Sequence, residues 1–405
     1  MHANYDSCID WLFQQFPSYQ FKGASAYKPG LENTLALLDA FGNPQESLKF
    51  IHVAGTNGKG STCSFLTSLL VEKGEKVALF TSPHVYDFRE RIRINGVEIS
   101  QQFVIDFCER IKSINFDFAP SFFEITLAMA LCYFQEENCS IVVLETGLGG
   151  RLDATNVVTP LISIITNIGI DHTQFLGDTL EAIAPEKAGI IKENIPIVIG
   201  QRQLETKPVF EKVAKTKNAP IYFAEEIELP LKIELQGYQA KNLKNALVGL
   251  SLLSYPISQN DLNNAIRNLK KNSGLFGRME KLQVNPTIII DVSHNKEGIE
   301  ATLNSLHLLD KTKLTILFGS SRDKDIDAMI KLFPKNAEIH LCMFQNERSQ
   351  NIERLTEIKE KNSSILAVHQ DVNRAINELS EQMQPTDLLL VIGSFFLISD
   401  VKISK

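Results

Sequence analysis

A glycine-rich segment with one lysine and two hydroxyl side chains is the strongest chemical signal in the sequence. It occupies residues 55–62 (GTNGKGST), directly after the apolar run 48–54 and directly before a helical pattern. Glycines between a strand and a helix let successive backbone N–H groups point at phosphate oxygens, and the helix start adds positive charge. Lys59 can reach the β- and γ-phosphates, and Ser61 or the next threonine can offer a hydroxyl to Mg²⁺. The segment predicts a phosphate loop, although Gly60 separates lysine from serine, unlike the common spacing; a plain glycine-rich turn is the alternative.

Carboxylate, hydroxyl and histidine side chains follow several of the apolar runs. Glu145 ends the run SIVVLE and precedes the glycine-rich GLGGR, so it suits the magnesium carboxylate of a phosphate loop better than a surface role. Ser82 follows KVALFT, and Asp171 and His172 follow LISIITNIGI. Ligands gather at the carboxyl ends of strands in open parallel sheets, so all four are candidates for a site. A lone histidine is nevertheless more often structural, and Glu124, inside an apolar helix, fits a buried structural pair as well as a functional role.

The elements that would position these side chains alternate between strand and helix patterns, which is typical of α/β architecture with a mostly parallel sheet. The expected strands are 48–54, 76–81, 140–146 and 161–167 in the first part and 287–292, 313–318, 338–344, 364–369 and 387–393 in the second. The expected helices are 61–73, 122–137, 296–308, 325–333 and 371–383. We predict an N-terminal P-loop ATPase-like domain (1–273) and a smaller C-terminal doubly wound, Rossmann-like α/β domain (274–405), with the polar stretch 270–278 as linker.

Composition and charge restrict the class of protein. The 405 residues are 44% hydrophobic and 22% charged, which suits two domains with cores. The formal net charge of −7, with both signs interspersed, gives no reason to expect nucleic-acid or membrane partners. The longest apolar run, 388–398, is short for a membrane span, and the N-terminus lacks the basic region of a secretory signal. The six cysteines form no C-x-x-C pair, so we expect reduced thiols in a cytoplasmic protein, without disulfides or zinc. We also expect a monomer.

Several segments together resemble the folylpolyglutamate synthase/dihydrofolate synthase family of the Mur-ligase superfamily, in particular its bacterial bifunctional members. They are IHVAGTNGKGSTC (51–63), TSPH…FRERIRING (81–96), ETGLGGRLDATN (145–156), NIGIDHTQFLG (167–177), EKAGIIK (186–192), GRME (277–280), DVSHN (291–295), FGSSRDKD (318–325) and IGSFF (392–396). The resemblance spans almost the whole chain. The GKGS of the loop also separates this family from the peptidoglycan Mur ligases, which usually carry GKT there.

The resemblance implies a nucleotide site with two magnesium ions. Ser61 and Glu145 would hold one Mg²⁺, and Ser82, Glu145 and His172 would surround the second, with Lys59 acting on the transferring phosphoryl group. The residues implied in ATP binding are Gly55, Thr56, Asn57, Gly58, Lys59, Gly60, Ser61, Thr62, Asn242, Arg278, Asp291 and His294.

The resemblance also implies a modified lysine and an acid-substrate site. Lys187 matches the lysine that the family carbamylates, and a carbamate is an anion that can help to hold magnesium. Arg151 and Asp153 would lie beside the pteroate substrate, with Asp153 as a pterin contact and the segment Phe21–Asn33 as a further pterin-side candidate. Lys59, Glu145, His172 and Lys187 would form the catalytic set.

The sequence departs from the family pattern at three places. The motif D-G-A-H-N-P reads DVSHNK at 291–296, Phe276 replaces the proline before GRME, and the segment Gly237–Asn242 is about one residue short. None of these changes removes a charged or liganding residue, so we expect loop conformation to differ rather than activity.

The implied reaction is an ATP-dependent ligation. Transfer of the γ-phosphoryl group to a carboxylate gives an acyl phosphate, which the amine of L-glutamate attacks. The acid would be dihydropteroate, a reduced folate or both. A folylpolyglutamate synthase alone, or another Mur-type acid–amino acid ligase, is the alternative within this class. A switch or motor ATPase and a folate-binding homologue without activity are alternatives from other classes, and dependence of ATP turnover on both an acid and an amino acid would exclude them.

Overall fold

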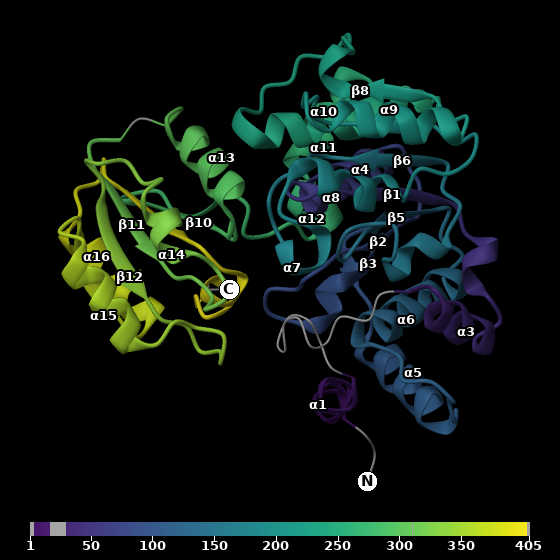
Figure 1. Cartoon of the computed structure of the whole chain (residues 1–405), viewed down its shortest axis with the longest axis horizontal. Coiled ribbons are helices and arrows are strands. Elements are labelled where there is room, and N and C mark those ends of the chain that lie inside the picture. Colours follow the sequence, from purple (N-terminus) through teal and green to yellow (C-terminus); the bar gives the residue numbers. More distant parts are fainter. Residues whose placement is uncertain (1–3, 17–29, 310, 403–405) are drawn as a thin grey trace. The chain divides into compact units, whose positions relative to one another are not determined.

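The computed structural model describes residues 4–16, 30–309 and 311–402, which form two compact units (Figure 1). The first takes in the described residues up to Leu235 together with Gln239–Leu275. The second takes in Gln236–Tyr238 and the described residues from Phe276 onwards. Each unit is built on a mostly parallel sheet with helices, so the predicted α/β class is confirmed.

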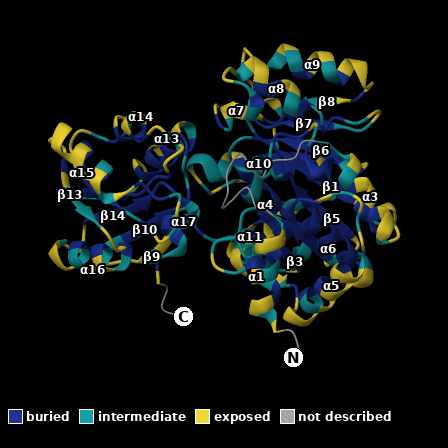
Figure 2. Ribbon diagram, turned by 60° about the horizontal axis from the view of Figure 1, so that its bottom comes forward, coloured by how far each residue is buried: buried dark blue, intermediate teal, exposed yellow. Residues whose placement is uncertain are grey.

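The sheet of the first unit has eight strands in the order β4-β3-β2-β5-β1-β6-β7-β8. Only the pairings β2–β3 and β3–β4 are antiparallel. The strands are β1 (Phe50–Ala54), β2 (Val77–Phe80), β3 (Ile92–Ile94), β4 (Val97–Glu98), β5 (Ile141–Glu145), β6 (Ile162–Ile165), β7 (Ile197–Ile199) and β8 (Ile221–Phe223). Every residue of β1, β2, β5 and β6 is buried, which explains their continuous apolar runs (Figure 2).

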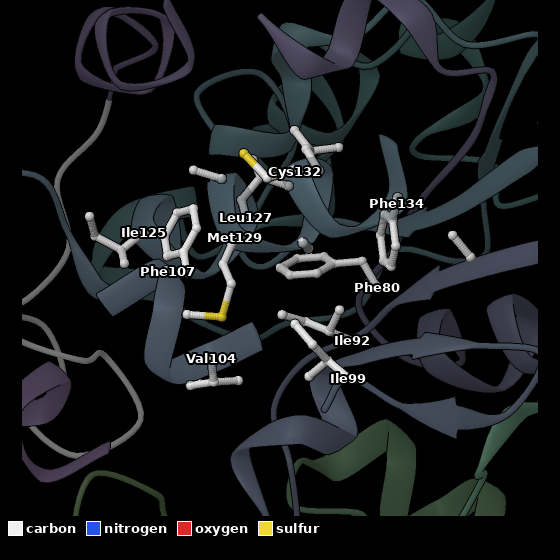
Figure 3. Packing of buried hydrophobic residues seen from close by; sticks show 14 of the residues in the cluster. Phe80, Ile92, Ile99, Val104, Phe107, Ile125, Leu127, Met129, Cys132 and Phe134 are labelled. Carbon is white, nitrogen blue, oxygen red and sulfur yellow. The ribbon is translucent and has the colours of Figure 1, made fainter. Parts of the chain in front are cut away.

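Helices cover both faces of this sheet. They are α1 (Tyr5–Gln15), α3 (Glu32–Ala40), α4 (Lys59–Glu72), α5 (Gln101–Ser113), α6 (Phe122–Glu136), α7 (Thr173–Leu176), α8 (Leu180–Ala188), α9 (Lys207–Thr216), α10 (Gly237–Leu252), α11 (Gln259–Arg267) and α12 (Leu269–Ser273). Successive side chains of a strand point to opposite faces, so Phe50 packs with α5 and α6 while Ile51 packs with α4 and α10. Figure 3 shows the first of these cores, with Phe80 and Ile92 of the sheet against Phe107, Met129 and Phe134.

The second unit has six strands in the order β13-β12-β11-β14-β10-β9, and only β9 is antiparallel. The strands are β9 (Glu280–Gln283), β10 (Thr287–Asp291), β11 (Leu314–Phe318), β12 (Glu338–Cys342), β13 (Ile365–His369) and β14 (Leu388–Ile392). Its helices are α13 (Lys296–Leu306), α14 (Ile326–Ile330), α15 (Ile352–Lys361), α16 (Val372–Gln382) and α17 (Phe395–Ser399). Helix α15 was not predicted, because only Leu355 and Ile358 of its polar sequence are buried.

The predicted linker 270–278 is partly wrong. Its first residues belong to α12, which packs against α4, the helix that follows the glycine-rich segment. The Asn272 amide donates to Ser68 Oγ at 3.1 Å and to Glu72 Oε1 at 2.8 Å. The helix ends at Gly274, whose φ of 73° is the left-handed conformation that glycine favours. Polar composition suggested a linker, whereas these buried hydrogen bonds make the segment part of the first unit.

All six cysteines are buried and unpaired, as expected for reduced thiols. Within the described ranges, no helix has both the length and the apolar character to cross a membrane. Most of the candidate segment Phe21–Asn33 lies outside the described residues.

Candidate active site

The predicted site residues follow four strands that lie side by side. The order β2-β5-β1-β6 is parallel throughout, so the carboxyl ends of the four strands meet at one edge. Ser82 lies just beyond β2, Glu145 ends β5, Gly55 follows β1 and Thr166 follows β6. The sheet therefore brings together groups that are far apart in the sequence, at the edge where ligands bind in open parallel sheets.

The segment after β6 holds the glycine-rich loop in its curled shape. Thr166 Oγ1 donates to the Asn57 carbonyl at 2.6 Å, and the Asn57 N–H donates to Asn167 Oδ1 at 2.9 Å. Gly55 has a φ of 149°, and a Cβ placed there would lie 1.9 Å from Thr166 Oγ1. Only glycine can take this backbone conformation so close to the next strand.

The start of α4 has the groups that a phosphate needs. The N–H of Thr62 makes a bond of 2.9 Å to the Gly58 carbonyl, so the N–H groups of the three preceding residues have no acceptor within the helix. Lys59 Nζ curls back over the loop and donates to the carbonyls of Gly55 at 3.2 Å and Thr56 at 3.3 Å. Free N–H groups at a helix N-terminus and an ammonium above the same loop form an anion site.

Two side chains predicted as oxygen ligands of a divalent metal lie beside this loop. Ser61 Oγ is buried and has no hydrogen-bond partner among the described residues, although it sits in the first turn of α4. The Glu145 carboxylate is buried, accepts the Ser82 N–H at 3.0 Å and lies 3.5 Å from where a Cβ on Gly60 would be. A hydroxyl and a carboxylate are the hard oxygen ligands that Mg²⁺ prefers, so the residues fit the predicted metal.

His172 lies in the loop after β6 and directly precedes α7, as its N-cap, with a left-handed φ of 51°. The Asp171 carboxylate accepts the His172 backbone N–H at 2.8 Å and fixes this turn. The structure thus places His172 in the loop that follows β6, the strand beside β1, while its role as a metal ligand stays a prediction. Glu124 has a structural role, because it completes the cap of α6 with Ser121 and accepts from Thr34 Oγ1 at 3.0 Å.

Lys187 is buried at the end of α8 and points at the phosphate loop. Its Nζ donates to the Gly55 carbonyl at 3.0 Å, the same oxygen that accepts from Lys59. The pKa of Lys187 is lowered to about 7, mainly by burial and then by the positive charge of Lys59, while the negative charges of Asp171 and Asp153 oppose the shift. The amine of Lys187 is therefore partly neutral near pH 7.

The residues predicted to bind ATP from outside the phosphate loop are divided between the two units. Asn242 packs on the phosphate loop, since a Cβ on Gly58 would lie 2.3 Å from Asn242 Oδ1. In the second unit, Arg278 and His294 both lie against the Phe395 ring, at 5.1 and 5.7 Å from its centroid.

Asp291 is fully buried in the second unit. It accepts from the Tyr238 hydroxyl at 2.7 Å and from the backbone N–H groups of Met279 at 2.9 Å and Ser293 at 2.8 Å. Its carboxylate thus fixes the turns around it. The predicted contacts of Arg278, Asp291 and His294 with ATP stay predictions.

Arg151 and Asp153 lie in the loop after Glu145 and differ in exposure. Arg151 is exposed and pairs with Glu186 at 2.9 Å. Asp153 is 4% exposed, and its carboxylate accepts the N–H groups of Leu148 at 2.7 Å and Thr155 at 3.0 Å. Burial raises the pKa of Asp153, and these hydrogen bonds oppose the rise. Asp153 therefore holds the loop together, and direct contact with a pterin stays a prediction.

Arg91 and His84 were not identified as site residues from the sequence. Arg91 is buried, lies 5.4 Å above the Phe122 ring and donates through Nε to His84 Nδ1 at 2.8 Å. Burial lowers the pKa of Arg91 to about 10, and the negative charge of Glu145 opposes this. Arg91 thus stays cationic at neutral pH, close enough to interact with Glu145, the predicted metal ligand. The segment FRERIRING contains three arginines, and only burial in the fold distinguishes this one.

Comparison with known proteins gives the family. Residues 53–267 match the Mur ligase middle domain, and residues 277–395 match the Mur ligase glutamate ligase domain. The dihydrofolate synthase/folylpolyglutamate synthase of Bacillus subtilis (strain 168) is 34% identical over 410 residues, which cover 93% of this chain and 94% of that protein.

Two solved structures are similar over 98% of this chain. One is the bifunctional folylpolyglutamate synthase/dihydrofolate synthase of Yersinia pestis complexed with AMPPNP and Mn ion, with a TM-score of 0.85, 27% identity and 97% of that chain covered. The other is the Escherichia coli FolC in complex with DHPP and ADP, with a TM-score of 0.83, 26% identity and 96% of that chain covered. Both domain matches fall in the two units described above and include the phosphate loop and the segments around Asp291. The chain is a Mur ligase and belongs to the dihydrofolate synthase/folylpolyglutamate synthase family.

Proposed function

We propose that this protein is an ATP-dependent ligase that joins L-glutamate to dihydropteroate and to reduced folates, releasing ADP and phosphate. The observation that carries the proposal is the arrangement around Gly55: a phosphate loop flanked by Glu145 on one neighbouring strand and met by buried Lys187. The relative from B. subtilis, named for both synthase activities, and the E. coli structure with DHPP and ADP support the choice of substrates.

Backbone and side-chain groups of the protein activate the acid substrate for attack by the amine. A carboxylate does not react with an amine while its leaving group would be oxide, so the γ-phosphoryl group of ATP is first transferred to it. The N–H groups at the start of α4 and the Lys59 ammonium stabilise negative charge on the transferring group. The neutral amine of glutamate then attacks the acyl phosphate through a tetrahedral intermediate. The site works mainly by positioning the two reactants.

The metal of this site is Mg²⁺, and we propose two ions. Ser61 and Glu145 would hold one, and Ser82, Glu145 and His172 the other. When bound, magnesium neutralises phosphate charge and orients the γ-phosphoryl group. The Mn ion in the Y. pestis complex supports a divalent metal in this family.

Lys187 carries a carbamate in the active protein. A carbamate forms from a neutral amine and CO₂ with loss of a proton, and the lowered pKa of Lys187 supplies that amine near pH 7. The product replaces a cation by an anion beside Lys59, so the charge conflict between the two lysines becomes an attraction.

One active site performs both ligations. Both reactions activate a carboxylate of the acid and attack it with the same amine, so the phosphate loop and metal ligands need not change; only the rest of the acid differs. The test is ADP formation with dihydropteroate and with a reduced folate, each with and without glutamate. Turnover with only one acid would reduce the activity to a single synthase, and turnover without acid or glutamate would indicate an ATPase instead.

A further inference from the structure

His52 is a fully buried polar side chain for which the ligase mechanism above has no role. It lies on β1, paired in register with Leu144 of β5 and Ser163 of β6, and it is 0% exposed. Its Nε2 lies 2.8 Å from Thr155 Oγ1. Burial lowers the pKa of His52 to about 3, so the ring is neutral in a working enzyme.

A chain of hydrogen bonds with one direction runs from His52 to Asp153. A carboxylate only accepts, so Thr155 Oγ1 donates its proton to Asp153 Oδ1 at 2.5 Å. The hydroxyl oxygen is then left to accept, and His52 must carry its proton on Nε2. His52 Nδ1 has no hydrogen-bond partner in the described part of the chain, which agrees with a bare nitrogen there.

The hydrogen-bond chain ends in the loop 147–156. This loop follows Glu145 at the end of β5 and contacts α8, the helix that carries Lys187. Asp153 Oδ2 accepts the Leu148 N–H at 2.7 Å, so the carboxylate ties the loop's start to Thr155. On its other side the loop is attached to α8 and the segment after it: the Arg151 N–H donates to the Glu186 carbonyl at 2.6 Å, and the Asn156 amide donates to the Gly189 carbonyl at 3.1 Å.

We infer that His52 is a positioning residue for the acid substrate, acting through Thr155 and Asp153 on the loop 147–156. This inference rests on the proposed function, because that loop carries the acid-side candidates Arg151 and Asp153. Thr166, which follows β6, holds the phosphate loop, whereas the hydrogen bonds from His52 lead to the loop after β5, so we expect His52 to act on the acid side and to leave the nucleotide side unchanged.

The test removes each link of the chain at nearly constant volume. Thr155→Val and His52→Leu should each lower kcat/KM for the acid substrate by about tenfold, with the KM for ATP changed by less than about twofold. Thr155→Ser and His52→Gln, which keep the hydroxyl and a donor in the place of Nε2, should recover most of this loss. The matched control is Thr67→Val in α4, a buried threonine whose Oγ1 has no partner in the described structure.

A double variant decides whether the two residues act as one unit. His52→Leu with Thr155→Val should lose no more than either single variant, because the first change already breaks the chain. The inference would be overturned if the losses of kcat/KM for the acid in the two single variants added up in the double variant. It would also be overturned if the KM for ATP rose by the same factor as kcat/KM for the acid fell. If His52→Leu does not fold, the comparison of Thr155→Val with Thr155→Ser tests the hydroxyl link, and the site of the ring proton in the wild-type protein tests the link to His52.

A measurement without substrate separates this inference from the proposed function. Nitrogen NMR of the wild-type protein labelled in its histidine rings, assigned by loss of one signal in His52→Gln, should show a neutral ring protonated at Nε2. A proton at Nδ1 would refute the hydrogen-bond chain whatever the substrates are. Wild-type protein without turnover on any pteroate or folate would refute the proposed function and leave the tautomer result standing.

Discussion

Replacing Lys187 by alanine tests the link between its buried amine and activity. At pH 7 a lysine with its ordinary pKa of 10.5 is neutral in about one molecule in 3,000, whereas a pKa of about 7 makes about half neutral. The fold therefore raises the reactive fraction by about 1,500-fold. Lys187→Ala would remove the proposed carbamate and its negative charge beside Lys59, and we expect kcat to fall at least about a hundredfold.

Carboxylate rescue and pH dependence follow from the same chemistry. Formate or acetate should restore part of the activity of Lys187→Ala, because a small anion can occupy the space of the carbamate. Lys192→Ala, a change of the same type five residues along the chain, is the matched control and should not respond to these acids. At a fixed concentration of dissolved CO₂, wild-type activity should fall as the pH drops below about 7, because the amine of Lys187 becomes protonated and no longer reacts.

The assay is carbon NMR of protein equilibrated with ¹³C-bicarbonate, alongside ADP formation. Wild-type protein should show a carbamate signal that is absent from Lys187→Ala. A fully active wild-type protein without this signal, or activity that does not change after strict removal of CO₂, would refute the reasoning.

Three further changes test other parts of the site and the fold. Lys59→Ala should lower kcat at least about a hundredfold without changing the melting temperature, since the ammonium serves phosphate charge; more than a tenth of wild-type kcat at saturating ATP would contradict this role. Glu145→Gln should move the midpoint of a magnesium titration to higher concentration, and an unchanged midpoint would make Glu145 structural. His52→Gln should make the free energy of unfolding less dependent on pH between about 6.5 and 3. In this pH range the unfolded chain takes up a proton on His52, whereas the buried ring, with a pKa of about 3, does not. The free energy of unfolding therefore decreases as the pH is lowered, by up to about 1.4 kcal/mol per pH unit. Urea unfolding at pH 7 and 5 measures this, and equal slopes in both proteins would exclude the effect.

The central strands were predictable because burial on both faces leaves a continuous apolar run. The run that ends at Glu145 is an example, and its observed strand differs from the expected one by a residue at each end. Parallel strands then bring their carboxyl ends together, which is why Ser82 and Glu145 could be assigned to one edge. Their contact through the Ser82 N–H agrees with that assignment.

The partners of buried polar groups were not predictable from the same pattern. Asp153 reads as an acidic residue in a glycine-rich loop, yet the loop folds so that backbone N–H groups surround its carboxylate. Arg91 is one of three arginines in its segment, and only its burial, against the Phe122 ring, distinguishes it from the other two. Polar helices such as α15 give a weak periodic signal, since two buried residues carry their packing.

The burial of all six thiols makes the natural chain suitable for selective labelling. Maleimide dyes react with exposed thiolates, and none of the natural cysteines is exposed. A cysteine introduced at Lys212 on α9 and another at Glu360 on α15, both exposed positions, would carry a donor and an acceptor on different units. Energy transfer between the dyes would then report in solution how nucleotide, acid and glutamate each change the distance between the two units.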